Sequence, residues 1–393
     1  MPKHPQRRIL RFHLETMVNK LKHCIFTLGI IVLVSACAHK SGESAQGTDI
    51  MTHAEYLTIV DGDGYSLADI RNPWDTTRML AQYILLNEGI DVPEGIDTQS
   101  RKVIKTPVKN ALVYYNIHVS LLHELGALDR VGGVCDSEYI TDSVARKRVA
   151  DKSIQDCGLS YQPNIEAVMK LRPDVIVLSP MENGDTHGKL ANMNIPVLEA
   201  ADYLEPYPLG RAEWMKLYGR LVGKGAKADS LFSKTEKEYN DIVFKTALCS
   251  NLPKVLFDGA YSGVWNVPTS RSATGTLIRD AAGYNPFDDY NDSGSAKLAP
   301  EEVIYKAADA DVWFVRYFSD TPKTLKQWGS EDKNYSRFNA FKNGNVWGSN
   351  TKYSGVFDDA AFHPQWILAD MALILHPSLQ GIKIHKHYYQ QLK

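Results

Sequence analysis

A long segment without proline, residues 209–248, constrains the fold of this chain more than any other feature. Its apolar side chains recur at the spacing of one helix face, which predicts helices with a buried stripe on an otherwise charged surface. Gly223 and Gly225 predict a break between two consecutive helices. A surface helical hairpin and a connector between two domains would both give this pattern. The stripe consists of Trp214, Tyr218, Leu221, Val222, Ala228, Leu231, Phe232, Thr235, Tyr239 and Ile242.

Two similar stretches flank this segment. Residues 164–178, NIEAVMKLRPDVIVL, predict a helix, a Pro-Asp turn and an apolar strand. Residues 299–315, APEEVIYKAADADVWFV, follow the same order with a two-residue insertion. Both have an early glutamate, a valine two positions later, and Asp-Val at the start of the strand. The repeated order predicts two similar α/β lobes, with a cleft between them.

The remaining patterns extend these lobes. Further strands are expected at 111–115, 131–134, 195–198, 254–257 and 345–348, and helices at 120–125, 179–194, 274–282 and 364–375. Strands that alternate with helices predict parallel sheets whose functional loops lie at the strand ends. Residues 56–90 mix strand-like and helix-like patterns around a turn at residues 61–64. We therefore expect an N-terminal lobe at 56–208, a connecting helical segment at 209–248 and a C-terminal lobe at 249–393.

The N-terminus has the pattern of an export signal. Residues 25–34, IFTLGIIVLV, carry no charge and follow Lys20 and Lys22, as in the apolar region of a signal peptide. The sequence Val-Ser-Ala-Cys, which ends at Cys37, resembles the lipobox of bacterial lipoproteins. That resemblance implies removal of residues 1–36, a diacylated Cys37 and a tether over residues 37–55. A signal peptide without lipidation is the alternative, and Met17 is a possible true start.

Composition limits the classes of function. The chain has 393 residues, 44% of them hydrophobic, enough for two domains with cores. Without residues 1–36 it has 38 basic and 45 acidic residues, a formal charge of −7. An acidic body without a basic run argues against nucleic-acid binding. Cys135 and Cys157 lie in loop-like contexts, where they could form a disulfide or remain free thiols.

The strand-end loops carry the candidate ligand-binding residues. Aromatic rings suit a bulky planar ligand, and arginines could pair with acidic groups on a chelate. Tyr114 and Tyr115 alternate along a strand, so one of them is expected to point inward. The candidates are Tyr114, Tyr115, His118, Tyr139 and Met181 in the first lobe, and Tyr261, Trp265, Arg271, Arg316 and Tyr317 in the second.

Two other classes of function, a binding protein for a bare metal ion and an enzyme, fit the sequence less well. A bare metal ion needs several converging His, Asp or Glu side chains. His118 and His187 could contribute from the first lobe, but the second lobe has no obvious histidine partner before His363. We therefore expect no metal site of the protein's own and no cofactor. Enzyme signatures fail as well, because residues 219–224, GRLVGK, are one residue short of a P-loop and no GxSxG elbow occurs.

The order of these elements resembles the periplasmic-binding-protein family that serves cobalamin, ferric-siderophore and haem ABC importers. The stretches GALDRVGGVCD, PLGRAEWMKLYGRLVGK, FKNGNVWG and HPQWILADMALILHP add to the resemblance, which covers residues 108–377. It implies two Rossmann-like lobes bridged by a rigid helix, with the ligand between them and no chemistry on it. The implied partners are an ABC permease and its ATPase subunits. We expect a monomer in the cell envelope.

The resemblance also implies a docking role for one carboxylate on each lobe. In this family such carboxylates pair with arginines of the permease. By motif they are Glu166 and Glu301, although Glu302 leaves the second position ambiguous by one residue. An exposed glutamate at a helix start that merely favours the helix dipole is the alternative.

Overall fold

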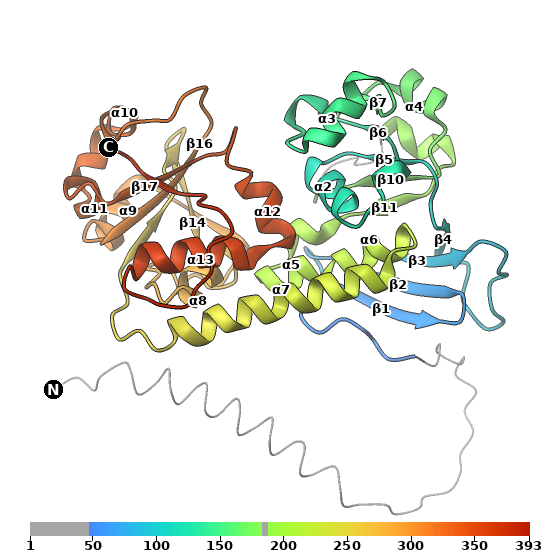
Figure 1. Cartoon of the computed structure of the whole chain (residues 1–393), viewed down its shortest axis with the longest axis horizontal. Helices are drawn as coiled ribbons and strands as arrows, with labels where there is room; N and C mark the ends of the chain where they lie inside the picture. The colour runs from blue at the N-terminus through green and yellow to red at the C-terminus, as the bar shows by residue number, and fades with distance from the viewer. Residues whose placement is uncertain (1–46, 183–187) are drawn as a thin grey trace, which may run out of the picture. The chain divides into compact units, whose positions relative to one another are not determined.

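The structure, a computed structural model, describes residues 47–182 and 188–393. The predicted signal peptide, Cys37, most of the tether and His187 lie outside these residues. The described part contains two α/β lobes and the long helix α7 (Gly225–Thr246), which runs along both (Figure 1).

The first lobe is built on a five-stranded parallel sheet in the order β11-β10-β5-β6-β7. All four side chains of the interior strand β10, Val-Ile-Val-Leu, are buried, as expected where helices cover both faces of a sheet. The sheet comprises β5 (Ala111–Val113), β6 (Val131–Val134), β7 (Gln155–Asp156), β10 (Val175–Leu178) and β11 (Val197–Glu199). Its helices are α2 (Asn116–Glu124), α3 (Ser143–Ala150) and α4 (Ile165–Leu171). The helix expected within 179–194 is a 3₁₀ helix, η3 (Gly188–Met193), where the structure describes it.

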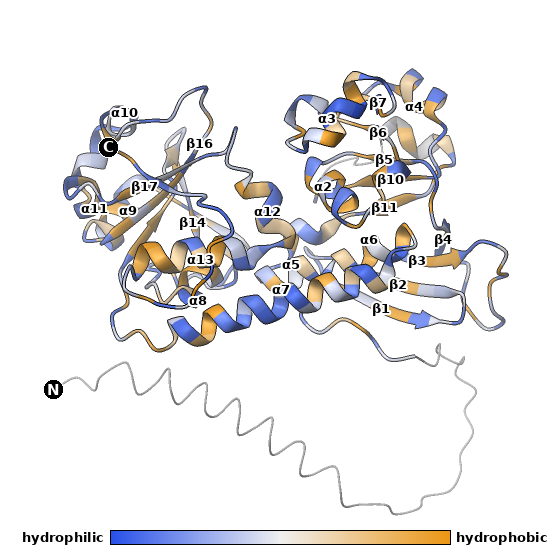
Figure 2. Cartoon of the chain, viewed as in Figure 1, coloured by the Kyte–Doolittle hydropathy of each residue, from blue (hydrophilic) through white to orange (hydrophobic). Residues whose placement is uncertain are grey.

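The second lobe combines two sheets. One has the order β12-β16-β17-β18, parallel except for its last pair, and the other is the antiparallel sheet β13-β14-β15. The strands are β12 (Val255–Phe257), β13 (Ala260–Tyr261), β14 (Val264–Pro268), β15 (Ser295–Leu298), β16 (Val312–Tyr317), β17 (Val346–Asn350) and β18 (Gln390–Gln391). The main helices are α8 (Ala273–Asp280), α9 (Pro300–Ala307), α10 (Leu325–Gly329), α11 (Asn339–Lys342) and α13 (Pro364–Leu375). Figure 2 shows hydrophobic residues concentrated along the strands of both central sheets.

The centres of the two main sheets share one arrangement. In the first lobe Ile176 of β10 pairs with Leu112 on one side and with Val197 on the other. In the second, Trp313 of β16 pairs with Leu256 and Val346 in the same relation. The predicted parallel α/β lobes are therefore confirmed. The likeness ends outside this centre, because β6 and β7 have no counterpart in the second sheet.

The predicted break in the helical segment is also confirmed. Helices α5 (Pro208–Glu213) and α6 (Met215–Leu221) precede α7, and Gly223 adopts the left-handed φ of 70° between α6 and α7. Near its N-terminus α7 buries Ala228 and Phe232 in the core of the first lobe. Further along it buries Tyr239 and Ile242 in the core of the second. The helix thus packs on both lobes with one apolar stripe.

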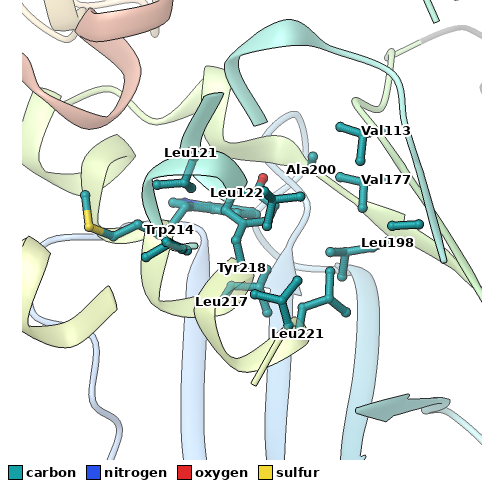
Figure 3. Close-up of a cluster of buried hydrophobic side chains, with 14 of the residues drawn as sticks. Val113, Leu121, Leu122, Val177, Leu198, Ala200, Trp214, Leu217, Tyr218 and Leu221 are labelled. Atoms are coloured by element: carbon teal, nitrogen blue, oxygen red, sulfur yellow. The ribbon is translucent and has the colours of Figure 1, made fainter. Parts of the chain in front are cut away.

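The first-lobe core lies where α6 meets the parallel sheet. Figure 3 shows Tyr218, Leu217 and Leu221 of α6 beside Val177 and Leu198 of the sheet. Trp214 is fully buried in the same cluster. Burying an aromatic or aliphatic side chain of this size contributes about 1.5–3 kcal/mol, so this contact is a main source of the lobe's stability.

A separate four-stranded sheet precedes the first lobe. It contains β1 (Leu57–Gly62), β2 (Tyr65–Arg71), β3 (Met79–Asn87) and β4 (Lys102–Thr106). The helix-like pattern seen within 56–90 is wrong, because the regular structure there is strand. The turn at 61–64 is confirmed: Gly62 pairs with Tyr65, and Gly64 takes a positive φ of 79°. Ile59, Ala68, Ile70 and Tyr83 pack from this sheet into the first-lobe core.

Two buried carboxylates hold the segment that leads into β1. Glu213 accepts hydrogen bonds from the backbone N–H groups of Thr52, His53 and Ala54, at 2.7–3.0 Å. Lys216 donates to the same carboxylate at 2.7 Å. Glu205 accepts from the next two backbone N–H groups, at 2.9 and 3.0 Å. Residues 52–56, most of which we expected to continue the tether, are therefore bound to the folded body through α5 and the loop before it.

No helix among residues 47–182 and 188–393 is long and apolar enough to span a bilayer.

Candidate ligand-binding site

Exposed aromatic rings mark the strand ends of the first lobe. Tyr115 follows β5 and is 36% exposed, while Tyr139 and Tyr161 are 55% and 80% exposed. The Tyr203 hydroxyl donates to the carbonyl of Pro180 at 2.6 Å, which links the loops after β10 and β11. Burial, followed by the charge of Asp136, raises the pKa of Tyr115, so its hydroxyl is neutral at physiological pH.

The second lobe presents a matching group of rings. Tyr261 lies at the end of β13 and is 82% exposed. Phe318 and Tyr353 follow β16 and β17 and are 63% and 62% exposed. Phe357, in the first turn of α12 (Val356–Phe362), is 51% exposed. Since the carboxyl ends of parallel strands lie at one edge of a sheet, Phe318 and Tyr353 belong to the same edge of the second lobe.

Helix α12 connects the two edges. Its Asp358 carboxylate accepts hydrogen bonds from the Asn116 side-chain amide at 2.7 Å and from the Thr141 hydroxyl at 2.6 Å. His363, just after the helix, contacts Glu124 of α2 at 2.7 Å. The end of α12 is buried in the first-lobe core through Phe362. A helix from the C-terminal half of the chain therefore reaches the end of β5 in the N-terminal half.

A small pocket lies beside this connection. It has a volume of about 150 Å³ and is lined by residues of α2, α12 and α13, namely Ile117, Ser120, Leu121, Glu124, Asp358, Asp359, Phe362, His363 and Trp366. This volume suits a few water molecules and is far below the 300–1,000 Å³ of a typical small-molecule site. The pocket therefore marks the contact between the lobes.

Arg316, at the end of β16, lies against α12. Its Nε donates to Asp258 Oδ1 at 3.0 Å, and its Nη2 donates to the other carboxylate oxygen of the same residue. The guanidinium also lies over the rings of Phe257 and Phe357, 4.9 and 5.2 Å from the ring centroids. Burial lowers the pKa of Arg316, but Asp258 outweighs it and the pKa is raised. Arg316 is therefore a fixed, paired cation.

Four of the predicted ligand-binding residues are buried. Tyr114 is 4% exposed and packs with Cys135 and Cys157, whereas its neighbour Tyr115 faces outward. His118 is 1% exposed, and its Nε2 contacts Asp202 at 2.9 Å and the Tyr218 hydroxyl at 3.1 Å.

The other two buried residues belong to the second lobe. Trp265 is 1% exposed, stacks on Trp313 and donates from its indole N–H to the carbonyl of Phe257 at 3.0 Å. Tyr317 is 8% exposed, and its hydroxyl accepts from the backbone N–H of Lys323. All four side chains are therefore packed inside their lobe.

The structure places the other six candidates at or near the strand ends. Asn116, which follows Tyr115, contacts α12 through Asp358, and Arg316 contacts the same helix through Phe357. Tyr139, Met181 and Tyr261 are exposed in separate loops. Arg271 stands apart from these, bound to Glu55 at 2.8 Å.

Sequence reasoning missed several residues of this region. Asn116, Thr141 and Asp358 escaped because their role depends on a contact over more than 200 positions. Asp258 immediately follows β12, and its left-handed φ of 53° gives no signal in a single sequence. Tyr161 and Tyr203 follow short strands and could have been found by extending the search to every strand end.

The two proposed docking glutamates occupy equivalent positions. Glu166 and Glu301 are each the second residue of their helix, α4 and α9, and each is exposed. Two residues further on, Val168 and Val303 are both buried. Glu302 instead accepts a hydrogen bond from Tyr290. Position in the helix thus matches Glu301, and not Glu302, to Glu166.

Two other sequence-based questions concern cysteines and metals. Cys135 and Cys157 are free, buried thiols, and burial raises the pKa of both, that of Cys157 to about 12. Among the described residues, no group of three or more His, Cys, Asp or Glu side chains could hold a metal ion.

The sequence is similar to that of a known protein family and of a lipoprotein. Residues 113–350 match the model of the periplasmic binding protein family. An uncharacterised lipoprotein of Methanocaldococcus jannaschii is 29% identical over 320 residues, which cover 77% of this chain and 75% of that protein.

Two solved structures share the fold at low identity. A periplasmic haem-binding protein of Pseudomonas aeruginosa is 13% identical with a TM-score of 0.57, covering 73% of this chain and 98% of its own. Helicobacter pylori CeuE with Ni(II) bound is 17% identical with a TM-score of 0.55, covering 71% and 87%. The family model spans more than half of the chain, including most strands of both main sheets and α7. This chain is a member of the periplasmic binding protein family, a family of solute-binding proteins.

Proposed function

We propose that this protein captures a large metal chelate, such as a ferric siderophore, haem or cobalamin, between its two lobes and delivers it to an ABC importer. The ligand would contact the exposed rings at the strand ends, including Tyr115, Tyr139, Tyr261 and Phe357. Binding and handover would be its whole mechanism, with ATP hydrolysed by partner subunits.

One observation supports this proposal above the others. Helix α12 joins the end of β5 to the second lobe through Asp358, so exposed rings from both halves of the chain lie near one contact. Aromatic side chains offer large contact area at small entropic cost, which suits a broad and rigid ligand. The fold is shared with a haem-binding protein and with a protein solved with Ni(II) bound, in agreement with such a cargo.

Delivery would depend on Glu166 and Glu301. Exposed carboxylates at equivalent positions of α4 and α9 give each lobe one negative charge at a helix start. Charge-assisted pairs with arginine are short and directional, and two of them would fix the orientation of the protein on a permease.

Membrane attachment would come from a diacylated Cys37. The relative from Methanocaldococcus jannaschii is named a lipoprotein, which supports this anchor. Two acyl chains give the stable anchoring that a single chain does not. Replacing Cys37 by Ser should release the protein from the membrane fraction. Continued membrane association of that variant would contradict lipidation at this cysteine.

A fluorescence titration tests the binding function. Trp347 is partly buried at the second-lobe sheet, and quenching or energy transfer to a coloured chelate is expected on binding. Purified protein should be titrated with haem, cobalamin and a ferric siderophore, and one of the three should bind saturably. Saturable binding of zinc or manganese ions alone would instead favour a binding protein for a bare metal ion. Chemical conversion of any ligand would favour an enzyme.

A further inference from the structure

The charges around the exposed rings restrict the kind of chelate that the site can take. A ligand rich in carboxylates would need free cations on the protein, because an unpaired anion is costly to remove from water. The contacts of each cation at the strand ends show whether its charge is already paired with an acid.

Arg316, which contacts α12 through Phe357, is already neutralised. Asp258 binds its guanidinium through two hydrogen bonds, a bidentate geometry that is among the stronger ion pairs. Phe257 and Phe357 lie on the guanidinium and restrict its movement. Redirecting Arg316 toward a ligand would leave Asp258 unpaired in a partly buried position, which is unfavourable.

The other described cations near the second-lobe rings are also paired. Lys352 lies over the rings of Phe318 and Tyr353 and forms an ion pair with Asp320. Lys323 pairs with Glu331 in the loop after β16. Arg271 pairs with Glu55. These pairs leave the second-lobe edge without a net positive charge.

The first-lobe edge is acidic. Its strand-end loops hold seven carboxylates: Asp202 and Glu205 are buried, Asp142 contacts His123, and the remaining four are Asp136, Glu138, Asp156 and Glu182. In the described loops that follow its strands (114–116, 135–142, 156–164, 179–182 and 200–207) there is no lysine, arginine or histidine. A ligand between the lobes would therefore face four negative charges on one side and compensated ion pairs on the other.

We propose, resting on the proposed binding function, that this protein selects chelates whose periphery is cationic or uncharged and rejects those with several free carboxylate or sulfonate groups. Exposed Tyr and Phe faces favour this choice, since an aromatic face attracts cations with about 0.5–2 kcal/mol. The carboxylates of the first lobe favour it too, because negative charges attract a cationic ligand that comes within a Debye length of them.

Two porphyrins of one size and opposite charge test the proposal. Tetrakis(N-methylpyridyl)porphyrin carries four positive charges and tetrakis(sulfonatophenyl)porphyrin four negative ones, and both report binding through their Soret bands. At physiological salt the cationic porphyrin should bind at least tenfold more tightly. Equal affinity, or tighter binding of the anionic porphyrin, would overturn the proposal.

The Asp258→Asn variant tests the role of the ion pair. Asparagine tolerates the left-handed φ of 53° at this position, so the backbone should be kept. Freeing the charge of Arg316 should raise the affinity for the anionic porphyrin about tenfold and lower that for the cationic one. Asp309→Asn is the matched control, since Asp309 pairs with Lys254 at the opposite edge of the sheet. An unchanged preference in Asp258→Asn would show that Arg316 does not set it.

Two further outcomes separate this proposal from the binding function. Phe357→Ala should lower the affinity for the cationic porphyrin, because the porphyrin is expected to stack on this ring. An unchanged affinity would indicate adsorption on the acidic surface and would contradict the proposal.

If neither porphyrin binds, the test is the charge of the chelate that binds in the fluorescence titration. An acid-rich chelate overturns the selection rule, and an uncharged or cationic one supports it. If no chelate binds either, the binding function itself fails.

Discussion

Asp358 accepts a hydrogen bond from Asn116, a residue 242 positions earlier in the chain, at 2.7 Å. Thr141 donates to the other carboxylate oxygen at 2.6 Å. One side chain of the short helix α12 thus holds the end of β5 and the loop before α3 against the second half of the protein. The contact also gives the protein a pH-dependent element at the junction of its lobes.

We predict that the stability contribution of Asp358 declines as the pH rises. Burial raises its pKa, with Asp359 adding to the effect and Lys386 opposing it. A raised folded-state pKa means that the contribution is fully present below the unfolded value of about 3.9 and is lost as pH rises through the folded value. Asp358→Asn keeps the shape and does not titrate, so its free energy of unfolding relative to wild type should increase from pH 4 to pH 7. Urea unfolding at both values measures this.

Removing the side chain gives the control for this prediction. Asp358→Ala loses both interlobe hydrogen bonds and should cost about 1–3 kcal/mol at pH 4, and less at pH 7, because alanine does not titrate either. A stability difference between Asn and wild type that stays constant from pH 4 to pH 7 would contradict the raised pKa.

The buried network at Asp202 should show the opposite pH dependence. Burial raises the pKa of Asp202, but His118, Arg211 and Tyr218 outweigh it and the pKa is lowered. The stability that this carboxylate contributes is therefore present above about pH 3.9 and is lost only as pH falls through the lowered value. Asp202→Asn should cost about 3–5 kcal/mol throughout pH 5–8, because it removes one partner of a buried charged network. A cost that already disappears at pH 5 would contradict this prediction.

Two aromatic residues separate a core role from a ligand role. Trp265→Ala should reduce the free energy of unfolding by about 3–5 kcal/mol, since the fully buried indole packs on Trp313, Tyr335 and Phe338. Tyr261→Ala should change stability by less than about 0.5 kcal/mol, because its ring is 82% exposed. The same Tyr261 variant should weaken chelate binding in the fluorescence titration. Unchanged affinity there would remove Tyr261 from the site.

Charge reversal tests docking on the permease. The double variant Glu166→Lys, Glu301→Lys should abolish uptake in cells and leave chelate affinity of the purified protein intact, because both side chains are exposed. Glu94→Lys, at an exposed glutamate in the loop between β3 and β4, is the control and should keep uptake. Normal uptake by the double variant would end the docking role.

The parts of the fold that follow from local pattern were predictable. Residues 164–178 are an example. Helix α4 has its apolar side chains on one face, the side chains of strand β10 are all buried, and both elements form as predicted. The apolar stripe along residues 209–248 is also buried as predicted, and it packs into the cores of both lobes. In each case the neighbouring residues determine the structure, so a single sequence is enough.

The four-stranded sheet and the antiparallel sheet of the second lobe were harder. Strand β3 is buried along Tyr83–Leu86 without alternation, because both faces of this sheet are covered, and a short apolar run of this kind does not distinguish a strand from a helix. Strand β14, the partner of the short β13, is itself paired with β15, some 30 residues later. Pairing over such distances leaves little trace in local sequence.

The site was predicted less well than the fold. A strand end predicts where a side chain emerges but not whether it turns into the core, and Trp265 turned inward because its indole N–H finds the carbonyl of Phe257. The pairing of Arg316 depends on the backbone angle of Asp258, and the contact at Asp358 depends on how α12 crosses to the first lobe. These are properties of tertiary packing that the order of residues does not display.

The attachment of the segment before β1 determines how a pulling force on the N-terminal chain would be transmitted. Asp49 and Ile50 pair with β1, and Glu213 then accepts hydrogen bonds from the three backbone amides of residues 52–54. Tension from upstream of residue 47 would therefore load β1 first and would then pass through Glu213 into α5 and the adjoining helices.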